Sequence, residues 1–128
     1  LERARVALRG PAPPIVKIGN LRSQRDFIPV TDAVDVFVRM VRGNFWGEVF
    51  NVCSGRVWTI DEIADKLLAH STRRIELKVD PDLVCSSEVD IIFGSNEKAR
   101  RCLGFEAGTS LETALKTAWD HHIGERCE

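Results

Sequence analysis

Hydrophobic residues recur at helical spacing in several separate stretches of this chain. The spacing predicts helices over residues 1–9, 31–42, 59–68, 97–103 and 110–122. In the helix over residues 31–42, four apolar residues share one side and are expected to form a buried stripe: Val34, Phe37, Val38 and Val41. In the last helix, the positions expected to face inward are Leu111, Ala114, Leu115, Ala118 and Trp119.

Signals for helix ends support this division. Thr31 is expected to cap the helix that follows it, with Asp32 and Asp35 in the first turn, where carboxylates are favoured. Residues 59–62 read Thr-x-x-Glu, the spacing of a capping box. Gly104 is expected to end the helix that precedes it.

Shorter apolar runs predict strands at residues 15–18, 49–52 and 75–79, and residues 25–30 are expected to form an extended loop. Short strands alternate with helices along the whole sequence, and no internal repeat divides it. The length is that of a single domain. We therefore expect one small α/β domain over residues 1–128, with short strands between helices.

Composition narrows the function classes. The residues are 44% hydrophobic and the net charge is −1, so no basic field favours nucleic acid or a membrane surface. No apolar run approaches the roughly 20 residues that span a bilayer. The four cysteines form no Cys-x-x-Cys pair, which favours free thiols and a cytoplasmic protein. The chain begins with Leu1 instead of Met, so we expect a fragment of a longer protein.

One loop carries residues suited to a phosphorylated ligand. Gly19-Asn20-Leu21 follows the first predicted strand, and Arg25-Asp26-Phe27 comes shortly afterwards. The planar guanidinium of Arg25 can give paired donors to two phosphate oxygens. The alternative is structural: Arg25 forms an ion pair with Asp26, Asp32 or Asp35.

The order of several motifs carries a resemblance to a known family. Residues 19–27 read G-N-L-R-S-Q-R-D-F, a V-x-D follows at residues 30–32, and residues 47–55 read G-E-V-F-N-V-C-S-G. This series resembles the extended short-chain dehydrogenase/reductase family, within it the branch of GDP-mannose 4,6-dehydratase and GDP-4-keto-6-deoxy-mannose reductase. The similarity runs over about residues 1–122 and implies the carboxy-terminal substrate-binding region of such an enzyme.

The resemblance implies roles for individual residues. Arg25 would contact the nucleotide diphosphate, and Asn20 belongs to the same substrate-binding loop. A second family motif, R-P-x-E-V, corresponds to residues 85–89, where Glu88 would accept hydrogen bonds from the ribose hydroxyls. The alternative for Glu88 is a solvated loop glutamate without a binding role. Cys85 stands where the family has a second phosphate-binding Arg. A thiol has no positive charge and no paired hydrogen-bond donors for a phosphate.

The sequence has no G-x-x-G-x-x-G loop and no Tyr, hence no Tyr-x-x-x-Lys pair. No residue here can inherit the family's catalytic or cofactor-binding roles, so we expect no catalysis and no cofactor in this chain alone, with NAD or NADP bound by the parent enzyme. The expected partner is a nucleotide-diphosphate sugar. We also expect a homo-oligomer, or association through an exposed domain interface. The competing hypothesis is a degenerate module that serves protein association without a ligand. Base stacking is disfavoured for the tryptophans: core packing is expected for Trp119, and a core or domain-interface role for Trp46 and Trp58.

Overall fold

The computed structural model describes residues 14–85 and 89–124. Their elements, in chain order, are β1 Ile15–Ile18, β2 Gln24–Asp26, α2 Val30–Arg42, β3 Val57–Thr59, α3 Ile60–Leu68, β4 Glu76–Val79, a short 3₁₀ helix Pro81–Leu83, β5 Ile91–Ile92, α4 Glu97–Leu103 and α5 Leu111–Gly124. The predicted α/β fold with short strands between helices is confirmed. The predicted helix over residues 1–9 lies outside the described residues.

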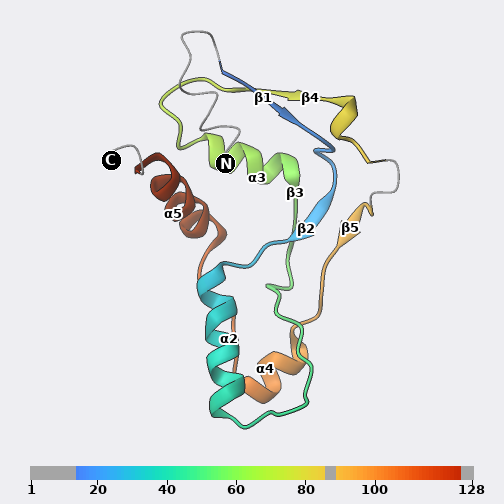
Figure 1. The fold of residues 1–128 in the computed structure, drawn as a ribbon, viewed down its shortest axis with the longest axis vertical. Coiled ribbons are helices and arrows are strands. Elements are labelled where there is room, and N and C mark those ends of the chain that lie inside the picture. The colour runs from blue at the N-terminus through green and yellow to red at the C-terminus, as the bar shows by residue number, and fades with distance from the viewer. Residues whose placement is uncertain (1–13, 86–88, 125–128) are drawn as a thin grey trace.

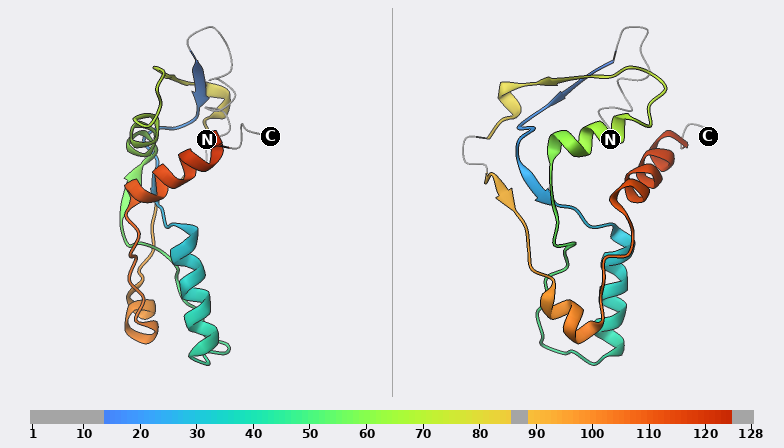
Figure 2. Two further views of the ribbon diagram at one scale, coloured as in Figure 1. Left: turned by 90° about the vertical axis from the view of Figure 1, so that its left-hand side faces the viewer. Right: turned by 180° about the vertical axis from the view of Figure 1, so that it is seen from behind.

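The molecule is elongated, with helices α2 and α4 side by side at one end and strands β1 and β4 at the other (Figures 1 and 2). Strand β1 pairs in parallel with β4, so that Ile15 lies opposite Glu76. The second sheet has the order β3-β2-β5. In it, β2 is antiparallel to β3 and parallel to β5, which places the Arg25 strand in the middle.

Helix α3 begins as its sequence predicts. The Thr59 side chain accepts a hydrogen bond from the Glu62 backbone N–H at 3.1 Å, and the Glu62 carboxylate accepts one from the Thr59 N–H at 2.8 Å. This reciprocal pair is a capping box, which satisfies two N–H groups that the first helical turn leaves without partners. The helix then packs against α5, and the Lys66–Glu112 ion pair of 2.7 Å joins the two.

The most deeply buried cluster lies between α2 and α4, and its members are Val36, Ala99, Leu103 and Phe105. Gly104 ends α4 with a φ of 61°, a left-handed conformation that a residue without a side chain adopts at little cost. The Arg39 guanidinium donates hydrogen bonds to the Leu103 and Gly104 carbonyls at 3.1 and 2.9 Å. Helix α2 is thereby fixed to the end of α4 by both apolar packing and hydrogen bonds.

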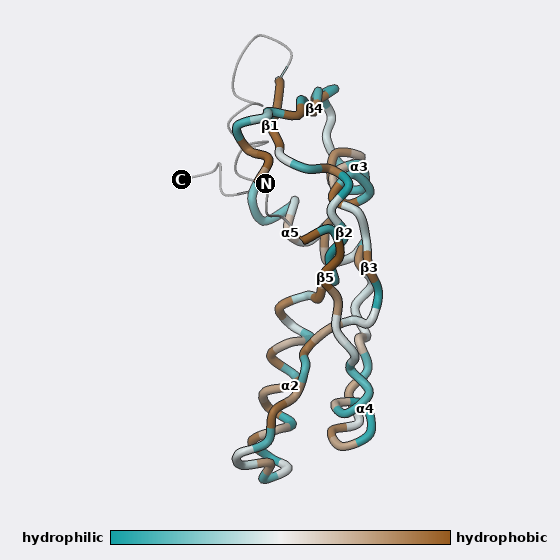
Figure 3. Tube along the Cα trace, turned by 90° about the vertical axis from the view of Figure 1, so that its right-hand side faces the viewer, coloured by the Kyte–Doolittle hydropathy of each residue, from teal (hydrophilic) through white to brown (hydrophobic). Residues whose placement is uncertain are grey.

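The expectations for α2 were wrong in two respects. The helix begins at Val30 with Pro29 as its N-cap, so Thr31 does not cap it, because proline already sets an extended conformation one residue before the first turn. The stripe expected to be buried is exposed: Val34 is 51% exposed, Phe37 57% and Val41 64%. Hydrophobic residues recur along the whole of α2 (Figure 3), yet only one side of it packs on α4.

The strand predicted at residues 49–52 was also wrong, since this segment has no regular secondary structure. A strand needs a neighbour for its backbone groups, and none of the strands in the described ranges pairs with it. Side chains bind the segment instead. Lys98 Nζ donates to the Val49 carbonyl at 2.8 Å, and Asn51 donates to the Ser95 carbonyl at 3.2 Å.

Candidate functional site

Arg25 lies at the centre of the three-stranded sheet, opposite Trp58 of β3 on one side and Ile92 of β5 on the other. The expected extended loop over residues 25–30 thus begins as part of a strand. The Arg25 guanidinium donates to the Gln24 carbonyl at 2.7 Å and to the Asp90 carbonyl at 3.3 Å. These contacts direct it towards the segment that enters β5.

The structural alternative for Arg25 was an ion pair with a nearby aspartate, and each aspartate is engaged elsewhere. Asp26 binds the turn that contains Ser54, Asp32 binds Thr109, and Asp35 binds Arg39 at 2.7 Å. None of the three accepts a hydrogen bond from Arg25. The guanidinium contacts the Gln24 and Asp90 carbonyls and none of these three carboxylates.

Asp26 holds a turn that is far away in the sequence. One of its carboxylate oxygens accepts hydrogen bonds from the Ser54 backbone N–H at 2.8 Å and from the Ser54 hydroxyl at 2.6 Å. The other accepts one from the Gly55 N–H at 2.8 Å. Gly55 has a φ of 77°, the left-handed conformation that glycine adopts most easily. The Asp of the R-D-F motif thus binds the Ser-Gly of the later motif, a link that sequence reasoning missed.

Asp32 performs the same task for a second loop. Its carboxylate accepts hydrogen bonds from the Thr109 N–H at 3.1 Å and from the Thr109 hydroxyl at 2.6 Å. The side chain is buried, which alone would raise its pKa, but the hydrogen bonds from Thr109, Gly108 and Thr31 outweigh this effect. The pKa of Asp32 is consequently lowered from its ordinary value. An ionised carboxylate therefore fixes the entry to α5 beside the start of α2.

Asn20 lies in the turn between β1 and β2. Its side-chain oxygen accepts a hydrogen bond from the Arg22 backbone N–H at 2.9 Å, which tightens the turn after β1. It lines a cavity of about 610 Å³ together with Gln24 and Thr59, which are partners across β2 and β3. Arg25 is the next residue of the strand, and successive side chains of a strand point to opposite faces.

The structure describes only part of the second family motif, residues 85–89. Cys85 is exposed and follows the 3₁₀ helix, whereas Ser86, Ser87 and Glu88 lie outside the described residues. The motif leads directly into β5, whose residue Ile91 pairs with Gln24. Strand pairing therefore brings Arg25 close to the end of this motif, although the two are more than 60 positions apart in sequence.

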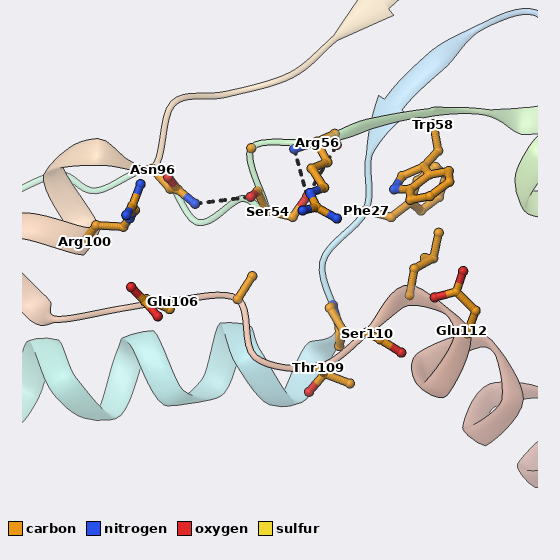
Figure 4. A pocket seen from close by; sticks show the side chains of 14 residues that line it. Phe27, Ser54, Arg56, Trp58, Asn96, Arg100, Glu106, Thr109, Ser110 and Glu112 are labelled. Carbon is orange, nitrogen blue, oxygen red and sulfur yellow. Dashed lines mark hydrogen bonds between the residues drawn. The ribbon is translucent and has the colours of Figure 1, made fainter.

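A cavity of about 560 Å³ lies between the Ser54–Gly55 turn and the loop that enters α5. Trp58 and Phe27 line one end of it, and Arg100 and Glu106 line the other (Figure 4). Trp58 is half-buried, with Lys66 Nζ 5.1 Å from its ring centroid. The expected packing role is confirmed for Trp119, which is 7% exposed, but Trp46 is 74% exposed and lies outside the core.

The expected absence of disulfides holds for the described cysteines: Cys53 is buried, and Cys85 and Cys102 are exposed. Burial raises the pKa of the Cys53 thiol, and the charge of the neighbouring Asp26 raises it further. Neutral thiols are poor nucleophiles, so Cys53 fills space beside the Ser54–Gly55 turn. Within residues 14–85 and 89–124, no helix is both long and apolar enough to cross a membrane.

Comparison with known proteins places this arrangement in the extended short-chain dehydrogenase class. Residues 4–118 match the model of one family, described as GDP-mannose 4,6 dehydratase, and the chain belongs to this family. It is 29% identical over 111 residues to the GDP-6-deoxy-D-talose 4-dehydrogenase of Aggregatibacter actinomycetemcomitans. It is also 24% identical over 113 residues to the GDP-6-deoxy-D-mannose reductase of Pseudomonas aeruginosa.

Each of these two alignments covers 86% of this chain but only 38% and 37% of the relative, so the chain spans well under half of their length. The structure of RMD from Pseudomonas aeruginosa complexed with NADPH is similar, with a TM-score of 0.84 and 22% identity. That alignment covers 97% of this chain and 42% of RMD, in its carboxy-terminal part. The predicted family and its predicted region are thus confirmed.

Proposed function

We propose that this chain is the nucleotide-sugar-binding part of an NAD(P)-dependent dehydratase, reductase or epimerase that acts on a GDP-sugar. The observation that carries the proposal is the pairing of β2 with β5, which brings Arg25 beside Asp90, the residue that follows the second motif. Arg25 and the end of that motif are thereby neighbours in the fold, although they are distant in sequence. Both curated relatives are named for GDP-6-deoxy sugars, which supports GDP as the nucleotide of the ligand.

In this proposal Arg25 binds the diphosphate, because a guanidinium offers charge-assisted hydrogen bonds to phosphate oxygens. Glu88 accepts hydrogen bonds from the ribose hydroxyls, and Asn20 belongs to the loop that borders the ligand. The nicotinamide cofactor, NAD or NADP, and the groups that transfer the hydride and proton belong to the rest of the parent enzyme. The chain alone then holds a substrate without transforming it.

The test is GDP binding measured by calorimetry on the full natural protein that contains this chain. Arg25→Ala removes the proposed phosphate contact and is expected to weaken GDP binding by roughly tenfold or more. Arg101→Ala is the matched control, because Arg101 is an exposed arginine on α4, away from the sheet. Equal GDP affinity for Arg25→Ala and the unmodified protein would contradict the proposal.

A second candidate function is protein association, and the exposed side of α2 favours it. Val34, Phe37, Val38 and Val41, here termed the outer face of α2, are between 39% and 64% exposed. Contiguous apolar surface of this kind usually marks an interaction site. If the chain serves association alone, changes to this face will abolish its function while Arg25→Ala leaves it intact.

A further inference from the structure

The Asp26 carboxylate connects the Arg25 strand to the turn that starts the neighbouring strand. Its three hydrogen bonds all come from Ser54 and Gly55, which lie just before β3 in the sequence. Asp26 is also the register partner of Val57, the first residue of β3. The same residue therefore fixes the position of β3 through its backbone pairing and through its side chain.

The position of β3 matters for Arg25 because the two strands are adjacent. Arg25 lies opposite Trp58, one step along the ladder from the pair formed by Asp26 and Val57. On its other side, Arg25 pairs with Ile92 and its guanidinium reaches the Asp90 carbonyl. A three-residue strand has few ladder hydrogen bonds of its own, so the Asp26 side chain supplies much of what holds β3 in register.

Asp26 acts without touching the ligand that Arg25 is proposed to bind. Successive side chains of a strand point to opposite faces, so its carboxylate lies on the side away from the Arg25 side chain. Both of its oxygens accept hydrogen bonds from the Ser54–Gly55 turn, at 2.6 to 2.8 Å. Its effect on binding must therefore pass through the backbone of β2 and β3.

We propose that Asp26 is a positioning residue for the diphosphate contact of Arg25, an inference that rests on the proposed function. Held by the Ser54–Gly55 turn, Asp26 keeps β3 against β2 and so orients the guanidinium towards the phosphates. Loss of the carboxylate leaves the turn's N–H groups without their acceptor and releases β3. Arg25 is then present but incorrectly placed, and its contribution to GDP affinity falls.

The experiment is a double-mutant cycle on GDP affinity in the full natural protein. Asp26→Asn replaces one of the two acceptor oxygens by an N–H₂ group, which cannot accept, so the Ser54 and Gly55 donors no longer each have a carboxylate oxygen. The expected result is GDP binding weakened by roughly tenfold when Arg25 is present and no further weakening in the Arg25→Ala background, because residues that act through one contact are not additive. A residue that only stabilises the fold would give additive changes.

Asp32→Asn is the matched control. Asp32 makes the same kind of contact, to the N–H and hydroxyl of Thr109, but at the start of α2 and away from β3. It is expected to lower the melting temperature while GDP affinity stays within about twofold, with no coupling to Arg25. Coupling of equal size for Asp32 and Asp26 would overturn the specific role of Asp26.

Ser54→Ala is the milder variant for the case in which Asp26→Asn does not fold. It removes the 2.6 Å hydrogen bond and keeps both backbone donors, so GDP binding should weaken by about threefold, only when Arg25 is present. Unchanged affinity in this variant would overturn the positioning role. If Arg25→Ala alone has no effect, the proposed function fails as well; if Arg25→Ala weakens binding and neither Asp26→Asn nor Ser54→Ala couples to it, only the positioning role fails.

Discussion

Restoring an arginine at position 85 is the sharpest test of how the second motif aligns with its family. Cys85 is exposed and precedes the segment that pairs with the Arg25 strand. A thiol offers no positive charge to a phosphate, so in the proposed site Arg25 faces the diphosphate alone. Cys85→Arg should supply the second cationic group and tighten GDP binding.

The magnitude follows from the type of contact and its exposure. A hydrogen bond to a charged group contributes about 1.5–3 kcal/mol. Because Cys85 is exposed, solvent screens part of this, and the lower end of the range applies. We therefore expect roughly a tenfold gain in GDP affinity at low ionic strength, since about 1.4 kcal/mol corresponds to tenfold. The gain should shrink as salt is added.

The assay is calorimetric titration of the full natural protein with GDP at two salt concentrations. Cys102→Arg is the control, because Cys102 is also an exposed cysteine but lies on α4. It adds the same charge elsewhere and should leave affinity nearly unchanged. If Cys85→Arg and Cys102→Arg bind GDP equally, position 85 is not next to the diphosphate, and the alignment of residues 85–89 with the family motif is wrong.

Two further predictions concern association and pH. Phe37→Ser on the outer face of α2 should reduce self-association in sedimentation experiments, with little change in melting temperature. Val36→Ala in the buried cluster should instead lower the free energy of unfolding by about 2 kcal/mol. If the Phe37 variant associates as strongly as the unmodified chain, this face is not the contact. The lowered pKa of Asp32 means that its ionised form stabilises the fold above the ordinary aspartate range and that this stability is lost as the pH falls through the folded-state pKa. Asp32→Asn should therefore be less stable at neutral pH and lose less stability between about pH 5 and pH 2 than the unmodified chain, measured by thermal melts.

Local signals predicted the helices well because their causes lie within a few residues. The Thr59–Glu62 capping box and the left-handed Gly104 involve neighbours in sequence, and both appear where expected. Strands β3 and β5, of three and two residues, gave no periodic signal, because an apolar alternation needs more positions to be visible. Only pairing with β2 defines them.

The candidate site shows the same division between local and distant causes. The motif order indicated that Arg25 matters, but not which groups hold it in place. Asp26 and Asp32 looked like possible ion-pair partners of Arg25 because they are near it in sequence. Their actual partners, Ser54 and Thr109, are 28 and 77 residues away, and no local pattern connects them.

The error about α2 has a different origin, and it bears on function. At about 100° per residue, Val36 and Met40 form one apolar side, while Val34, Phe37 and Val41 extend the apolar surface well beyond it. A helix that contacts one neighbour needs a narrower stripe. The pattern predicts burial for both sides of the helix, but the spacing of apolar residues does not say which segment would cover each side. Within the described residues, the Val36 side packs against α4, whereas the outer face stays exposed.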